Sequence, residues 1–226
     1  MQHVVAVFTL LQPKLSAFIM FTLIGLPRDV WAGRICHFLE LAEIVRTHSA
    51  AASSSAQATF EQHINGYDGI VKVSIGKDDQ AQLCWLKNHR VYPMSLELQV
   101  GFDRAALVDI LAHVRVLTFE ADSISDDEDF EGLVYQCAPQ LTSLTITDCN
   151  TLTCDAFVRS VSYCNQLTAI SVNYCIGLDE RTLATVTRFC PSVRHFKMSN
   201  FELDLIVDGF EHFPHLVSFE GHEMFV

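Results

Sequence analysis

The sequence predicts an α/β repeat fold in which parallel strands line a concave face and helices lie outside them. Three observations predict it. Between Cys137 and Phe213 a short apolar pattern recurs every 26 residues. A cysteine precedes each copy, as Cys137, Cys164 and Cys190. The segments between the copies carry helix signals. A fixed period in the twenties is typical of repeat architectures, in which each unit buries its apolar side against its neighbours.

The repeated pattern has apolar residues at its first, fourth and sixth positions. The clear copies begin at Leu141, Leu167 and Val193. Weaker copies lie upstream and downstream and begin at Ile70, Pro93, Val114 and Leu216. Successive copies start 21 to 27 residues apart. We therefore expect about seven units between residues 66 and 226, each with one strand and a helix or looser turn.

The connecting segments have the residues that begin helices. Thr153 and Asp179 occupy equivalent positions and are both favourable N-cap residues. Phe157 and Val161 then lie four residues apart, on one helix face. In the preceding unit, Ser125 to Glu128 has the form of a capping box with Ser125 as the cap.

The composite pattern Cys-x-x-Leu-x-x-Leu-x-Leu-x-x-Cys-x-x-Leu-Thr, read across the clear copies, resembles the cysteine-containing class of leucine-rich repeat. The resemblance implies a solenoid with a parallel sheet on the concave side. A cysteine that recurs once per unit is interpreted as a small buried hydrophobic residue, not as a metal ligand or a disulfide partner. Phe201 stands where the third copy should have its second cysteine, which supports that interpretation.

The residues that alternate with the apolar positions are expected on the concave face. They are small, polar and mixed in sign, and they include no cluster of Tyr, Trp or Arg, the residues that usually dominate binding energy. We expect a partner surface around His195, Lys197 and Glu220. The alternative is a solvated face without a partner.

Residues 23–65 are predicted to form a small helical segment before the repeats. Pro27 and Asp29 suit the first turn of a helix, and the apolar residues that follow recur at helical spacing. Their order resembles an F-box, the segment that binds a Skp-family adaptor of cullin-type ubiquitin ligases. The resemblance implies this adaptor-facing set: Leu26, Pro27, Val30, Ile35, Phe38, Leu39 and Ile44. The alternative is that these residues form an internal core.

The match to an F-box weakens after Val45. The family usually has a Val-Ser/Cys-x-x-Trp-type segment near its end, whereas this chain has a run of small polar residues between His48 and Ser55. F-boxes commonly precede leucine-rich repeats in substrate-selecting ligase subunits, so the two resemblances imply a chain that positions a protein substrate and is not itself an enzyme. The alternative is an interaction scaffold without a ligase role.

Residues 1–22 form an apolar lead-in, and only Lys14 interrupts the uncharged stretch from Val4 to Leu26. About 20 apolar residues suffice to cross a bilayer, but a central lysine opposes insertion by about 2.5–3.5 kcal/mol. A buried helix and an anchor or export signal within residues 4–26 both stay open. The corresponding locations are cytoplasmic or nuclear in the first case and membrane-anchored or exported in the second.

The composition argues against several function classes. A net charge of −12 disfavours nucleic acid as a partner. The chain has no phosphate-binding glycine loop, no Gly-x-Ser-x-Gly turn and no His-Glu-x-x-His motif. We therefore expect no catalytic residues, no cofactor and no metal. Five of the eight cysteines fall on repeat positions, which favours reduced thiols in an intracellular protein.

Overall fold

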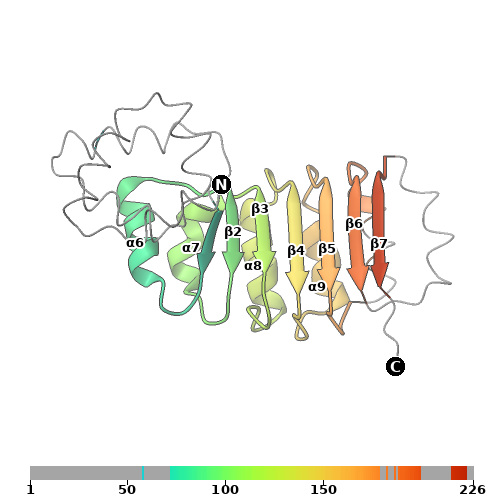
Figure 1. Ribbon diagram of the computed structural model, residues 1–226, viewed down its shortest axis with the longest axis horizontal. Coiled ribbons are helices and arrows are strands. Elements are labelled where there is room, and N and C mark those ends of the chain that lie inside the picture. The colour runs from blue at the N-terminus through green and yellow to red at the C-terminus, as the bar shows by residue number, and fades with distance from the viewer. Residues whose placement is uncertain are drawn as a thin grey trace, which may run out of the picture.

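A computed structural model of the chain describes residues 72–178, 182, 186, 188–199 and 215–222, together with residue 58. The described part is built on one sheet of seven strands, all parallel and arranged in chain order (Figure 1). The strands are β1 (Lys72–Ile75), β2 (Ser95–Leu98), β3 (Val116–Phe119), β4 (Ser143–Thr147), β5 (Ala169–Asn173), β6 (His195–Ser199) and β7 (Ser218–His222).

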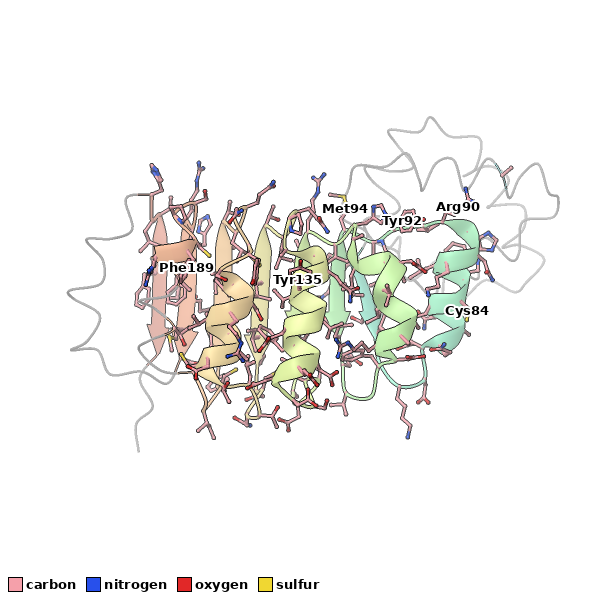
Figure 2. The ribbon with its side chains drawn as sticks, turned by 180° about the vertical axis from the view of Figure 1, so that it is seen from behind. Cys84, Arg90, Tyr92, Met94, Tyr135 and Phe189 are labelled. Carbon is pink, nitrogen blue, oxygen red and sulfur yellow. The ribbon has the colours of Figure 1, made fainter. Side chains whose placement is uncertain are left out.

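A helix occupies each connection between the first five strands. These helices are α6 (Gln80–His89), α7 (Arg104–Leu111), α8 (Asp127–Cys137) and α9 (Cys154–Val161). All four lie on the same side of the sheet, behind the strands in Figure 1 and in front of them in Figure 2. The described chain is thus an α/β repeat with a helix layer on one face and bare strands on the other, as the sequence predicts.

The pairing register places equivalent apolar residues side by side. The fourth position of each predicted copy forms one continuous row: Val73, Leu96, Leu117, Leu144, Ile170, Phe196 and Phe219. The sixth position forms a second row two residues further along each strand. The side chains of both rows are buried from β1 to β6. All seven strand positions inferred from the repeated apolar pattern are therefore confirmed, including the weak copies at Ile70, Pro93 and Leu216.

The core lies between the strand rows and the inner faces of the helices. Phe130 of α8 packs on Phe119 of β3 with ring centroids 5.3 Å apart. Phe157 and Val161 of α9 are both fully buried, which confirms that they share the inward helix face. Burying a side chain of this size contributes about 1.5–3 kcal/mol, so every unit adds to a core that continues into the next.

The predicted N-cap of α9 is confirmed, whereas the predicted N-cap of α8 is wrong. Thr153 caps α9, because its hydroxyl accepts a hydrogen bond from the Ala156 backbone N–H at 3.3 Å. The predicted Ser125 cap of α8 is wrong by one residue: Asp126 is the cap and accepts from the Asp129 N–H at 2.8 Å. Asp126 is extended at the position immediately before the helix, whereas Ser125 uses its hydroxyl to donate to the Asp129 carboxylate.

The recurrent cysteines are core residues. Cys137, Cys164 and Cys190 are fully buried free thiols, and burial raises the pKa of each to about 12. A thiol with so high a pKa stays protonated at neutral pH and is a poor nucleophile or metal ligand. Cys84, by contrast, is exposed on the outer side of α6 (Figure 2).

Several sequence predictions lie outside the described residues. They are the apolar lead-in, the F-box-like segment apart from residue 58, and the expected cap at Asp179. The adaptor-facing set lies there in full: Leu26, Pro27, Val30, Ile35, Phe38, Leu39 and Ile44. Within the described residues, no helix combines the length and the hydropathy needed to cross a membrane.

Replacing a repeat cysteine should cost stability, whereas replacing the exposed one should not. We expect Cys164→Ser to lower the free energy of unfolding by about 1–3 kcal/mol, because a hydroxyl is placed in an apolar site. Cys84→Ser is the matched control and should stay within about 0.5 kcal/mol of the wild type. Urea denaturation measures both. Equal effects of the two substitutions would contradict the packing role.

Gly177 lies where the backbones of two units approach closely. A Cβ atom at Gly177 would lie 2.2 Å from the Leu152 carbonyl oxygen of the preceding unit. We expect Gly177→Ala to destabilise the protein by about 1–3 kcal/mol, because backbone atoms must separate to admit the methyl group. Gly76→Ala is the control, since its Cβ would meet only side-chain atoms of Gln99 and Asp79, the nearest at 3.4 Å. Thermal unfolding that ranks the two variants the other way would refute this explanation.

Candidate protein-interaction face

The strand face, defined as the side of the sheet turned away from helices α6 to α9, is the candidate site. The register sets its side chains in rows across the strands. One row contains Ser74, Glu97, Thr118, Thr145, Ser171, Lys197 and Glu220. The row before it contains Lys72, Ser95, Val116, Ser143, Ala169, His195 and Ser218. The face is thus small and polar, as expected.

The predicted partner residues His195, Lys197 and Glu220 lie together at the β6–β7 end of this face. The His195 ring nitrogen Nδ1 is 2.8 Å from the Ser218 hydroxyl. The Lys197 ammonium is 3.3 Å from the Glu220 carboxylate, and both side chains are substantially exposed, at 40% and 62%. All three predicted residues line one open depression of about 290 Å³.

Polar and charged groups line this depression. It offers one imidazole, one ammonium, one carboxylate and several hydroxyl groups from β4, β5 and β7. Lys197 and Glu220 already pair with each other, and an exposed pair of this kind contributes only about 0–1 kcal/mol. Both charges therefore stay available for exchange with a partner. No group of His, Cys, Asp or Glu within the described ranges is arranged to hold a metal ion.

A second charged cluster, centred on Glu97, occupies the β1–β2 end of the face. Glu97 accepts a contact of 2.6 Å from the Lys72 ammonium and a hydrogen bond of 2.7 Å from the Ser74 hydroxyl. Burial acts to raise the pKa of Glu97, but the Lys72 and Ser74 contacts outweigh it and hold the pKa below its ordinary value. Sequence reasoning placed Glu97 on the face but missed Lys72. The sequence feature that could have revealed this contact is that Lys72 and Glu97 have opposite charges and occupy diagonal positions on neighbouring strands.

Two serines counted among the concave-face residues belong to the fold. Ser95 and Ser199 are only 6% and 2% exposed. The Ser199 hydroxyl accepts a hydrogen bond of 2.8 Å from the Tyr174 backbone N–H in the neighbouring unit. Alternation along a strand predicts which way a side chain points, but it does not predict what else covers that side chain.

The helix layer carries an aromatic pair that sequence reasoning missed. Tyr135 of α8 and Tyr163 after α9 are 64% and 56% exposed and meet edge to face at 5.4 Å. They line a depression of about 390 Å³ beside the Arg159–Glu131 ion pair. The sequence feature that could have revealed this pair is the similar position of the two tyrosines in their units. Tyr135 lies two residues before Cys137, and Tyr163 lies one residue before Cys164.

No protein-family model matches this chain, and no curated protein matches it either. The structure itself defines the class, which is an α/β repeat protein with a parallel sheet, a helix layer on one side and a polar strand face on the other.

The Glu97 cluster predicts a pH-dependent contribution to stability. Because the pKa of Glu97 is lower in the folded protein than in the unfolded chain, the ionised form stabilises the fold above the unfolded pKa. That contribution disappears as the pH falls through the folded pKa. We expect Glu97→Gln to lower the free energy of unfolding at pH 7 by about 0.5–1 kcal/mol, with no difference from wild type once Glu97 is protonated.

Urea titrations between neutral and acidic pH measure this effect. Glu120→Gln is the control, because Glu120 forms no ion pair with a described residue. A Glu97→Gln deficit that persists unchanged in acid would show that the loss comes from packing and not from ionisation.

Proposed function

We propose that this chain is a substrate-recognition subunit of a cullin-type ubiquitin ligase. Residues 23–65 would bind a Skp-family adaptor, and the repeat array would hold a protein substrate for ubiquitin transfer by other subunits. The observation that carries the proposal is the order of the two parts: an F-box-like apolar series is followed directly by a register-matched parallel repeat array with a bare polar face.

The repeat array has the physical properties that such a role needs. Each strand is hydrogen-bonded to its neighbours in a fixed register, so side chains on the strand face keep constant separations. A substrate segment laid across the strands would meet the Lys197–Glu220 pair and the His195 ring. The proposed contribution of the chain is therefore positioning, and the proposed location is the cytoplasm or nucleus.

A second candidate is an interaction scaffold without a ligase role. The gathering of His195, Lys197 and Glu220 around one depression supports this candidate, because a recognition surface on the strand face needs no adaptor. The two candidates share the substrate-binding step and differ only in the role of residues 23–65. Adaptor binding therefore separates them.

Adaptor binding can be measured with the full chain and a purified Skp-family adaptor. We expect the wild type to bind and the variant Leu26→Ala/Pro27→Ala/Ile35→Ala to bind at least about tenfold more weakly, because truncated anchor residues in an interface each cost more than about 1 kcal/mol. Thr145→Ala on the strand face is the matched control and should leave adaptor affinity unchanged.

Two outcomes of this measurement would contradict the proposal. If the wild type fails to bind under conditions in which an established F-box protein binds the same adaptor, the ligase proposal is refuted and the scaffold candidate is favoured. If the triple variant binds as well as the wild type while remaining folded by circular dichroism, the adaptor-facing assignment of those residues is wrong.

A further inference from the structure

The charged residues in the described connections between strands and helices are segregated between the two edges of the sheet. The connections that lead into strands β2 to β6, residues 90–94, 112–115, 138–142, 162–168 and 190–194, contain no Asp or Glu. The connections that leave strands β1 to β4 contain many, and Lys77 is their only Lys or Arg. These acids are Asp78, Asp79, Asp103, Glu120, Asp122, Asp126 and Asp148.

The edge at which strands β2 to β6 begin carries exposed arginines. We call it the basic edge and define it by Arg90, Tyr92, His113, Arg115 and Arg194, all of which are exposed. Figure 2 shows Arg90 and Tyr92 beside Met94 along this edge. None of its three arginines forms an ion pair with a described carboxylate.

Arginines elsewhere in the described chain are engaged. Arg104 lies 2.6 Å from the Asp129 carboxylate, Arg159 lies 2.5 Å from that of Glu131, and Arg188 lies over the Phe189 ring. In a chain with a net charge of −12, the basic edge thus gathers three arginines that form no ion pair with a described carboxylate. The negative end of the helix dipole favours Lys and Arg side chains near the C-terminus of a helix. Arg115 and Arg194, however, lie outside the helices, directly before strands β3 and β6.

The backbone holds part of the basic edge in a rigid row. The Thr142 N–H donates to the Arg115 carbonyl, the Thr168 N–H to the Thr142 carbonyl, and the Arg194 N–H to the Thr168 carbonyl, each at 2.8 Å. Arg115 and Arg194 are therefore three strand spacings apart, or about 14 Å. Beside Arg115, the exposed Tyr92 ring stacks on His113 with ring centroids 3.9 Å apart.

We propose that the basic edge binds an extended acidic segment of a partner protein. Its spacing defines the segment: carboxylates that reach Arg115 and Arg194 together are about 14 Å apart, which is about four residues of extended chain. Arginine pairs with carboxylates in a bidentate manner, and the Tyr92–His113 stack adds an aromatic contact of the kind enriched in interfaces. The inference concerns a surface separate from the strand face and does not depend on adaptor binding.

The acidic opposite edge does not cancel this attraction. A five-residue strand spans about 16 Å, and the Debye length at physiological ionic strength is about 8 Å. A bound segment at the basic edge is therefore screened from the acids at the other edge. Nucleic acid is the less suitable partner, because its dense phosphates need many clustered Lys and Arg side chains and would approach a chain of strongly negative net charge.

Fluorescence anisotropy of the full chain at about 0.15 M salt tests the proposal with defined probes. The first probe is a fluorescein-labelled peptide with glutamates four residues apart and small neutral residues between them. The second has glutamine in place of each glutamate, and the third is a single-stranded RNA oligonucleotide. We expect the wild type to bind the glutamate peptide and to bind neither the glutamine peptide nor the RNA.

The variant Arg115→Glu/Arg194→Glu should weaken binding of the glutamate peptide by about tenfold or more. Lys77→Glu, an exposed charge reversal at the opposite edge, is the control and should leave binding unchanged. Because neither arginine has a described ion-pair partner, the double variant should keep its circular dichroism spectrum; if it does not, Arg115→Gln/Arg194→Gln replaces it.

Three results would overturn the proposal. They are no binding of the glutamate peptide to the wild type, equal binding to the wild type and the arginine variant, and binding of RNA in preference to the glutamate peptide. Each result is independent of whether residues 23–65 bind an adaptor, so failure here and failure of the ligase proposal are distinguishable.

Discussion

Every feature of this protein depends on the in-register parallel ladder that joins one repeat to the next. A single unit has one short strand and one short helix, which together cannot bury the side chains of Leu144 or Phe130. Stacking the units closes the core from both sides and satisfies the backbone of each strand through its neighbours. The recurrent cysteines fit this constraint, since a small side chain such as Cys164 fills the narrow space between helix and strand without a polar group that needs a partner.

The parallel ladder also makes the two edges of the sheet different. Because all strands run in one direction, every described helix begins at the same edge of the sheet and ends at the other. Asp126 caps α8 and Asp127 lies in its first turn at the first edge, where the positive end of the helix dipole favours acids. Arginines such as Arg115 and Arg194 are left at the second edge. The local preferences of charged residues at each helix end thus add up to a difference in charge between the two edges of the sheet.

The same geometry separates three surfaces with different chemistry. The strand face is polar and held in a fixed register, the helix layer exposes the Tyr135–Tyr163 pair, and the basic edge presents arginines that form no ion pair with a described carboxylate. Burial keeps the Cys164 and Cys175 thiols protonated at neutral pH, and the Lys197 and Glu220 charges on the strand face form an exposed ion pair.

The sequence alone determined the architecture of the described part. Because one strand recurs in each unit, the repeated apolar pattern predicted the row from Val73 to Phe219. Alternation along strands brought His195, Lys197 and Glu220 to one face. Tertiary structure decided what periodicity does not encode: the burial of Ser95 and Ser199, the diagonal Lys72–Glu97 contact, and the alignment of Arg115 with Arg194 in one row. These three features depend on which residues become neighbours across strands. The residues involved are two dozen or more positions apart in the sequence, so their contacts form only when the units stack.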